Sequence, residues 1–266
     1  MFYRSTDGGR TWSRPLFLDG SPLLGDSQGV GGLYVAAGPD DHVYVAGCGN
    51  EGPMVATSTD AGQTFGTWTL FAAGQDKGME SPFRSGMVCM LAVDTSDGPL
   101  RGMVYMVWSD TRNGNRDVYF AGMPGDMVAG GHAMDPVEAV KLNDDAGAAD
   151  QFFPAIAVSP GGAVDVAWYD RRNGADPGVY DIYFTYSPDG GKTWAPNLRV
   201  TDQSSDGQYS HHQNGNVFIG DYMDIDSSLD CAWPVWVDTR AHKADVMTAC
   251  IERPGEAVAS MAPSSP

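Results

Sequence analysis

An eight-residue pattern occurs three times in the chain, and it restricts the possible folds more than any other feature. It reads S-x-D-x-G-x-T-aromatic. The aspartate can accept hydrogen bonds from turn amides, the glycine allows a positive φ, and the aromatic residue anchors the returning strand. The copies cover residues 5–12, 58–65 and 187–194, with the aspartates at Asp7, Asp60 and Asp189. The pattern predicts three tight β-hairpins in a fold of repeated units.

A second pattern, W-x-D-x-R, alternates with the first at residues 108–112, 168–172 and 236–240. Each copy ends an apolar run and precedes another strand-like segment, with Asn, Gly and Asp between them, which is typical of a hairpin. Four stretches each hold three or four short β-branched or aromatic runs, and none has a helix-length amphipathic pattern. They are residues 30–75, 86–142, 151–201 and 216–252.

Small sheets of this kind cannot bury both faces alone, and a β-propeller stacks them around an axis. A sandwich or a β-helix does not explain why the two patterns alternate. We therefore predict an all-β propeller of four-stranded blades, with four fairly complete units and an N-terminal half blade. The propeller is expected to form one domain over residues 1–253, and residues 254–266, rich in Ala, Ser and Pro, are expected to be a disordered tail.

The first pattern resembles the Asp-box, or BNR, repeat of sialidase-like propellers. The segments 168–173, 181–184, 194 and 220–222 also resemble bacterial exo-α-sialidase-like proteins. This resemblance implies a sialidase-like β-propeller of the six-bladed type, of which this chain would lack upstream pieces. Its open blade edges would be covered by another chain, as in a homo-oligomer, unless the two ends close onto each other.

Composition excludes several classes of partner. The formal net charge is -18, and the basic residues do not gather into runs, so we expect no nucleic-acid partner. No segment approaches the roughly 20 apolar residues of a membrane span, and the N-terminus lacks the apolar stretch of a signal peptide. The resemblance nevertheless implies an extracellular or periplasmic protein.

The four cysteines, Cys48, Cys89, Cys231 and Cys250, are too few and too widely spaced for a zinc module or a C-x-x-C redox site. Cys231 and Cys250 lie on two strands of a predicted hairpin and almost face each other, so a disulfide between them is sterically reasonable. Four buried thiols are the alternative.

The expected ligand site follows from the hairpin order. The Asp boxes join the third and fourth strands of each blade and lie on one face of the disc. The turns between second and third strands and the links between blades lie on the other face, around the central channel. That face collects Asp110, Arg112, Asp170, Arg172, Asp238 and Arg240, together with the links 75–84, 143–153 and 202–222.

The arginines of this face have two interpretations. A guanidinium can hold a ligand carboxylate in a bidentate fork. Alternatively, each Asp and Arg pair braces its own hairpin, which the threefold repetition favours because a pocket is asymmetric. Arg84 lies outside the repeat and is the better individual candidate for ligand binding.

Sialidase-family enzymes use three arginines on the sugar carboxylate, a tyrosine nucleophile assisted by a glutamate, and an aspartate as acid. This chain has no clear copy of the family's arginine, isoleucine, proline signature, and it has only five glutamates. By resemblance and position we predict Glu80, Asp221 and Tyr222 as catalytic residues. The predicted substrate-binding residues are Arg84, Arg112, Arg172, Asp110, Asp170 and His211.

No cofactor or metal is predicted. His211 and His212 are adjacent, but no third ligand is indicated beside them. The loop 113–117 has oxygen side chains that could bind Ca²⁺, although turn formation is their more ordinary role.

Three functions are consistent with these features. The first is a sialidase-like glycoside hydrolase acting at the central face on a glycan that can be anionic. The alternative is a non-catalytic Asp-box propeller that binds glycan or protein. A third is a structural fragment of a longer extracellular enzyme.

Overall fold

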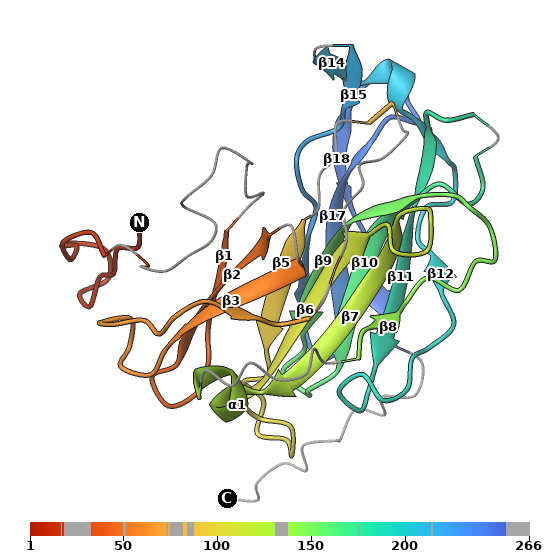
Figure 1. Ribbon diagram of the computed structural model, residues 1–266. Coiled ribbons are helices and arrows are strands. Elements are labelled where there is room, and N and C mark those ends of the chain that lie inside the picture. The colour runs from red at the N-terminus through yellow and green to blue at the C-terminus, as the bar shows by residue number, and fades with distance from the viewer. Residues whose placement is uncertain are drawn as a thin grey trace, which may run out of the picture.

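The computed structural model describes residues 1–16, 18, 33–49, 52–72, 74, 82–83, 88–130, 138–174, 176–213 and 215–253. It is an all-β structure with four main antiparallel sheets (Figure 1). The first sheet contains β1 (Tyr34–Ala37), β2 (Val43–Gly49), β3 (Gly52–Ser58) and β4 (Thr69–Leu70). The second contains β5 (Cys89–Val93), β6 (Met103–Asp110), β7 (Asp117–Pro124) and β8 (Val140–Lys141). A short helix, α1 (Gly125–Ala129), follows β7.

The third sheet contains β9 (Gln151–Val158), β10 (Val164–Asp170), β11 (Val179–Ser187) and β12 (Leu198–Arg199). The fourth contains β16 (Asp224–Ser227), β17 (Cys231–Asp238), β18 (Asp245–Thr248) and β19 (Ile251–Glu252), and β18 and β19 pair with different stretches of β17. The link between these two sheets holds β13 (Ser205–Asp206), which pairs with β11, the 3-10 turn η1 (Gly207–Tyr209), and the hairpin of β14 (His211–Gln213) and β15 (Asn216–Phe218).

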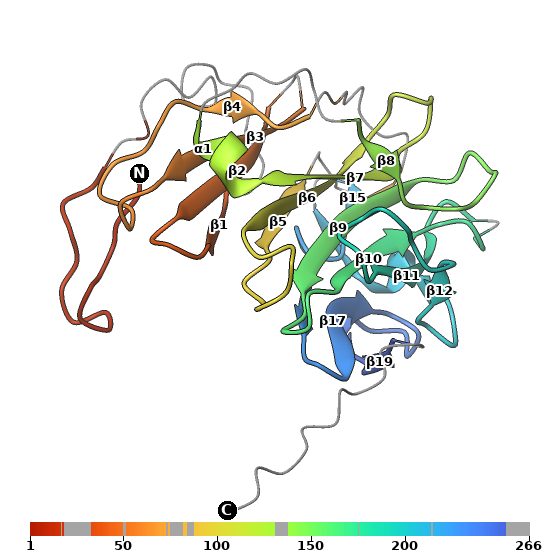
Figure 2. The same cartoon turned by 90° about the horizontal axis from the view of Figure 1, so that it is seen from below.

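The four sheets follow one another in an arc, which Figure 2 shows from below. The first strand of each sheet is innermost: β5 contacts both β1 and β9, and β9 contacts β16. Strands of one sheet lie side by side, whereas neighbouring sheets meet through their side chains, as blades of a propeller do. The prediction of an all-β propeller architecture is confirmed, and the number of blades in a closed ring stays a prediction.

Apolar side chains of facing sheets form the core. One cluster lies mainly between the first and second sheets and includes Tyr44, Val104 and Trp108. A larger cluster joins the second, third and fourth sheets and includes Phe120, Trp168 and Trp236. The strands β6 and β10, in the second and third sheets, are buried on both faces, which explains why they read as nearly continuous apolar runs.

The Asp boxes form the turns after β3 and β11, and the first copy lies in an N-terminal hairpin closed by the bridge from Phe2 to Leu16. In the third copy, Asp189 accepts bonds from the Thr193 amide at 2.8 Å, the Thr193 hydroxyl at 2.7 Å and the Ser187 hydroxyl at 2.8 Å. In the first copy, bonds from the Thr11 hydroxyl and amide lower the pKa of Asp7 to about 2. The predicted hairpins are confirmed.

Two disulfides settle the open question of the cysteines. Cys48 on β2 is bonded to Cys89 on β5, with Cα atoms 5.5 Å apart, and so joins the first sheet to the second. Cys231 is bonded to Cys250, with Cα atoms 5.3 Å apart, and ties β17 to the segment between β18 and β19. Among the described residues, no helix is long and apolar enough to cross a membrane. The predicted tail, residues 254–266, lies outside the described residues.

Candidate functional site

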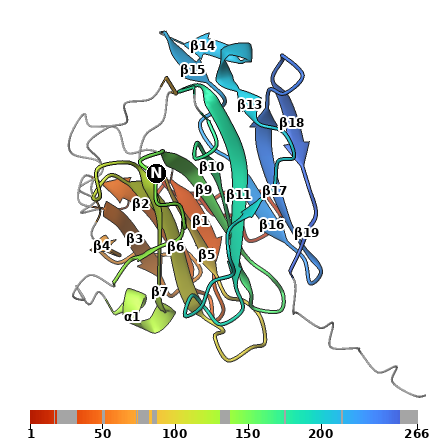
Figure 3. The same cartoon turned by 90° about the vertical axis from the view of Figure 1, so that its right-hand side faces the viewer.

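The face opposite the Asp boxes is built from links that are distant in sequence. The β14–β15 hairpin projects from the ends of the third and fourth sheets (Figures 1 and 3). It also contacts the link between the first and second sheets, because the Val217 amide donates to the Pro82 carbonyl at 2.7 Å and Phe83 bridges to Val217. Phe83 in turn packs against Phe152 and Tyr180 of the third sheet, with ring centroids 5.2 and 5.6 Å away.

The W-x-D-x-R hairpins lie on this face, between second and third strands as predicted, and each tryptophan donates to the aspartate of its own motif. The indole Nε1 of Trp108 lies 2.9 Å from Asp110 Oδ2. The corresponding distance is 2.8 Å from Trp168 to Asp170 and 3.2 Å from Trp236 to Asp238. All three aspartates are buried, so each carboxylate depends on these internal donors.

The arginines of the motif neutralise the same carboxylates. Arg112 binds Asp110, and its guanidinium carbon lies 4.1 Å from the ring centroid of Tyr119. Arg172 binds Asp170 at 2.9 Å and lies 4.1 Å over the ring of Tyr183.

Arg172 also reaches Asp144 of the preceding link, at 2.6 Å. Arg240 binds Asp238 and Asp202 in the same manner. Burial opposes the charge of Arg172, but its bonds to the neighbouring aspartates raise its pKa overall. The geometry therefore favours the bracing interpretation: each guanidinium binds the aspartate of its own hairpin. Arg112 and Arg172 also stack on a tyrosine of that hairpin, and Arg172 and Arg240 also bind an aspartate of an adjoining link.

A buried polar chain continues from these braces and was missed by the sequence reasoning. The amide of Asn143 donates to Asp117, Asp145 and Gln151 at 2.7–2.8 Å, and Gln151 donates to Asp170 at 3.3 Å. These residues join the second sheet to the third. In the sequence they are scattered polar residues of loops and strand ends, so no spacing identifies them.

Where the first and fourth sheets approach each other, this face contains a hollow of about 350 Å³, which we call the axial hollow. Tyr34 at the start of β1 and Tyr222 just before β16 meet there edge to face, with ring centroids 6.0 Å apart. The pKa of Tyr34 is raised well above its usual range by burial, and further by Tyr222 and Asp224. The side chain of Tyr222 is 46% exposed. The lining residues are Tyr34, Met90, Tyr222, Met223, Asp224, Val235, Trp236, Val237 and Val246.

A second hollow, of about 240 Å³, lies between the β10–β11 turn and the β14–β15 hairpin. Its polar lining residues are Asp176, Asp206, Gln208 and His212. His211, which was predicted to bind substrate, instead lies against Phe218, with ring centroids 6.4 Å apart. Successive side chains of a strand point to opposite faces, so only one of the two histidines can line this hollow.

The predicted site residues fall into three groups. Tyr222 lines the axial hollow, and Asp221 precedes it in the chain. Asp110, Arg112, Asp170 and Arg172 are joined within their own hairpins. Glu80 and Arg84 lie outside the described residues. Tyr34 and Asp224 were not predicted, and no local pattern marks them. Within the described part of the chain, no three His, Cys, Asp or Glu side chains are grouped so that they could hold a metal ion.

No family model and no curated protein matches this chain. Solved structures of the same fold do. An α-L-arabinanase of Penicillium chrysogenum complexed with arabinobiose has 12% identity and a TM-score of 0.53, over 93% of this chain and 66% of that chain. An α-L-arabinofuranosidase of Fusarium graminearum with arabinobiose has 14% identity and a TM-score of 0.51, over 94% and 84%.

A polysaccharide lyase, ulvan lyase, has 12% identity and a TM-score of 0.50, over 84% of this chain and 53% of that chain. This chain therefore spans about half the length of that enzyme. At these identities the likeness shows the fold alone, which is a β-propeller also found in carbohydrate-active enzymes. None of the three is a sialidase, and the Asp-box family assignment stays a prediction.

Proposed function

We propose that this chain is a glycan-processing propeller of the glycoside hydrolase type, with its sugar site at the axial hollow. The observation that carries the proposal is the meeting of Tyr34, Tyr222 and Asp224 at the inner ends of the first and fourth sheets. A sugar ring packs its C–H face on an aromatic side chain, while a carboxylate accepts bonds from its hydroxyls. The solved structures of the same fold that hold arabinobiose support a saccharide as the ligand.

The proposed chemistry is that of a retaining glycosidase with a tyrosine nucleophile. The Tyr222 oxygen attacks the anomeric carbon as its hydroxyl proton passes to one carboxylate, Asp221 or Asp224, and the bond to the leaving oxygen breaks as the other, protonated, carboxyl group gives that oxygen a proton. Water then cleaves the glycosyl–tyrosine bond, giving a proton to the second carboxylate, while the first returns its proton to the tyrosine oxygen. Tyr34 positions Tyr222 through the edge-to-face contact.

The finer, sialidase-type version of this proposal adds residues of the link between the first and second sheets. Glu80 would assist the tyrosine, and Arg84 would bind the carboxylate of an anionic sugar. Arg112 and Arg172 are left out of the sugar site, since their guanidinium groups are bound by Asp110 and Asp170.

A non-catalytic glycan-binding propeller is the second candidate, and the lining of the hollow favours it. Among the described residues that line the hollow, Asp224 is the only carboxylate, and most of the others are apolar. Such a wall suits a binding platform, whereas hydrolysis requires a second group with proton-transfer chemistry within reach of the same sugar.

An extracellular or periplasmic location belongs to the same proposal. The chain holds two disulfides, Cys48–Cys89 and Cys231–Cys250, and bonds of this kind form and persist in oxidising compartments.

A panel of fluorogenic glycosides, including a sialoside and an arabinofuranoside, tests the proposal on the purified chain. Tyr222→Phe removes the nucleophile, and we expect turnover to fall by at least about 100-fold, which corresponds to about 2.7 kcal/mol of transition-state stabilisation. Tyr34→Phe keeps the ring contact and should retain most of the activity.

Tyr3→Phe is the matched control, because Tyr3 is exposed in the N-terminal hairpin, away from the hollow. If Tyr222→Phe kept the turnover of the wild type, the tyrosine mechanism would be excluded. No turnover on any glycoside, together with saccharide binding that Tyr222→Ala abolishes, would favour the binding propeller.

A further inference from the structure

A third hollow, of about 440 Å³, lies between the first and second sheets and shares no residue with the axial hollow. Its volume is within the range of about 300–1,000 Å³ that is usual for ligand sites. Three segments line it, within residues 39–44, 99–103 and 124–126. Both sheets that bound it are described, and the Cys48–Cys89 disulfide joins them. We call it the outer hollow.

The outer hollow is on the face that carries the Asp boxes. The Ala61 amide, in the second box, donates to the Asp41 carbonyl at 2.8 Å, so the turn between β1 and β2 lies beside that box. Figure 1 shows α1 at the opposite end of the sheets from the β14–β15 hairpin. A ligand of the outer hollow would therefore not meet a sugar in the axial hollow.

A buried tyrosine hydroxyl without a partner faces the outer hollow. Tyr44 is 1% exposed and lines the hollow, and no described residue forms a hydrogen bond with its hydroxyl. A Cβ at Gly125 would overlap this hydroxyl and the Gly102 carbonyl, so glycine is needed for the three to meet. Burial and the charge of Asp126 raise the pKa of Tyr44 to about 12, so the hydroxyl is neutral at physiological pH. A buried polar group in this position is costly unless a ligand supplies its partner.

The other polar groups of the outer hollow are mainly hydrogen-bond acceptors. Asp40 and Asp126 line it, and neither forms an ion pair with a described side chain. The ring of His42 stacks on Tyr44, with centroids 6.0 Å apart. Its Nδ1 lies 3.0 Å from the Pro39 carbonyl oxygen and 3.1 Å from that of Asp40. Because carbonyls only accept, Nδ1 carries the proton, and the neutral ring offers Nε2 as a further acceptor.

The one guanidinium of the outer hollow is already bound within its own turn. Arg101 donates to the carbonyls of Thr95 and Ser96 at 2.8 and 3.0 Å, and it lies 3.8 Å from Asp97. The carboxylates of the W-x-D-x-R hairpins each have an arginine, whereas those of the outer hollow have none among the described residues. The outer hollow therefore has an excess of negative charge and of acceptors.

The rest of the lining is apolar and suits a hydrocarbon stem. It consists of Pro39, Pro99, Leu100, Met103 and Pro124, with backbone of the two glycines. An ammonium group has three donors and no acceptor, which complements a set of acceptors beside such a wall. The formal net charge of -18 also attracts organic cations to the chain from a distance.

We propose that the outer hollow binds an organic ammonium ion on an aliphatic stem, as in a free alkyl amine or the lysine side chain of a peptide. The ammonium donates to Asp126, Asp40 and the hydroxyl oxygen of Tyr44. The stem packs on the proline and leucine side chains of the lining. This site goes beyond the proposed sugar chemistry and does not depend on it.

NMR titration of the isotope-labelled full chain tests the proposal with three probes of similar length. They are cadaverine, Nα-acetyl-lysine methylamide and, as the uncharged control, Nα-acetyl-norleucine methylamide. We expect the two amines to shift amide resonances of residues 39–44, 100–103 and 124–127, and the norleucine probe to leave them unchanged. Binding should weaken between about 20 mM and about 0.5 M NaCl, because salt screens the carboxylates. Tighter binding of cadaverine would indicate a free amine, and tighter binding of the lysine probe a peptide.

Substitutions separate a built site from diffuse attraction of cations. Tyr44→Phe should weaken amine binding by about tenfold, as expected for a lost hydrogen bond to a charged group. It should not lower the thermal stability, since the hydroxyl has no described partner to lose. Asp126→Asn should weaken binding by about threefold, because an exposed ion pair contributes little. Asp97→Asn is the matched control, since this exposed carboxylate is near the hollow but does not line it.

Two results would overturn the proposal. One is shifts spread over the acidic surface with an affinity that Tyr44→Phe and Asp97→Asn change equally or not at all, which would mean diffuse screening. The other is binding of the norleucine probe as tight as that of the lysine probe, which would mean that the ammonium is not recognised.

Discussion

The W-x-D-x-R hairpins and the axial hollow lie on the same face and are built in opposite ways. In the hairpins, the carboxylate and guanidinium groups bind one another, and the same arrangement occurs three times. The hollow occurs once, and Tyr222 remains 46% exposed there beside Asp224. A charged motif repeated in three of the four sheets serves the fold, whereas the candidate ligand site is built from residues outside the repeat.

The largest effect expected from this difference is on stability. Asp170→Ala removes a buried carboxylate that binds Trp168, Arg172 and Gln151, and it leaves the arginine without its main partner. We expect a loss of about 3–5 kcal/mol in the free energy of unfolding, measured with urea. The control is Asp230→Ala at an exposed position. Equal stability of the two variants would mean that the brace does not support the fold.

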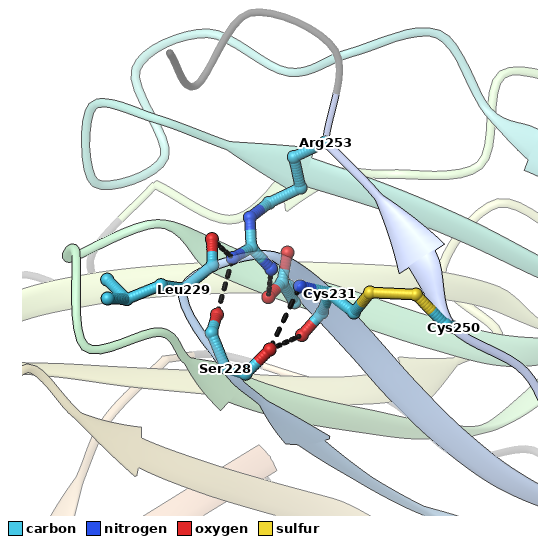
Figure 4. The surroundings of a disulfide bond; sticks show 6 residues. Ser228, Leu229, Cys231, Cys250 and Arg253 are labelled. Atoms are coloured by element: carbon cyan, nitrogen blue, oxygen red, sulfur yellow. Dashed lines mark hydrogen bonds and ion pairs between the residues drawn. A yellow bond between two sulfur atoms is a disulfide. The ribbon is translucent and has the colours of Figure 1, made fainter. Parts of the chain in front are cut away.

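The second expected effect is a loss of stability in the fourth sheet, which forms one wall of the axial hollow. Cys231→Ser combined with Cys250→Ser frees the end of β17, and the expected cost is about 3 kcal/mol. Figure 4 shows this disulfide beside Arg253, which donates to the Ser228 and Leu229 carbonyls at 2.6 and 2.8 Å and forms a buried ion pair with Asp165 at 2.7 Å.

Hydrogen exchange of the double variant should speed up in β17 and leave β10 protected. Uniform loss of protection would show that the fourth sheet and the braces of the third unfold as one unit.

A smaller effect is expected at the Asp boxes, which are also repeated. Asp189→Asn weakens the bonds from Thr193 and Ser187, and we expect a cost of about 1 kcal/mol at neutral pH, as for a lost capping residue. Although burial opposes it, these bonds lower the pKa of Asp189 in the folded chain.

The contribution of Asp189 is therefore fully present above the unfolded-state pKa near 3.9 and is lost as the pH falls through the lowered pKa. Thermal unfolding from pH 7 to pH 2 should show the wild type and the variant converging at the acidic end. A constant difference over the whole range would remove the ionised carboxylate from the explanation.

Local patterns predicted those parts of the structure that depend on neighbours in sequence. The turn at Asp189 and the hairpin at Asp170 each hold their partners within a few residues, so their spacing identifies them. The contact between Tyr34 and Tyr222 could not be predicted in this way, because it joins the first sheet to the fourth. The Cys48–Cys89 bond is similar, since it links two sheets whose packing the spacing does not specify.

The β14 strand is a second example of a feature that spacing in the sequence could not predict. The sequence shows that His211 and His212 are adjacent, but only the position of Pro82 and Val217 determines that His212 lines a hollow. Val217 of the same hairpin is buried, and its amide donates a hydrogen bond to Pro82, which belongs to a link from elsewhere in the chain. The charges of Arg112 and Arg172 indicate anion binding equally well until their stacking on Tyr119 and Tyr183 is known.

The most direct test of the account is to locate where a saccharide binds. Backbone amide resonances of the isotope-labelled chain can be followed by NMR during titration with arabinobiose and, separately, with sialyllactose. The account predicts that shifts are centred on Tyr34 and residues 222–225, with little change at residues 110–112 and 170–172. Shifts centred on the W-x-D-x-R hairpins, with an undisturbed axial hollow, would contradict it.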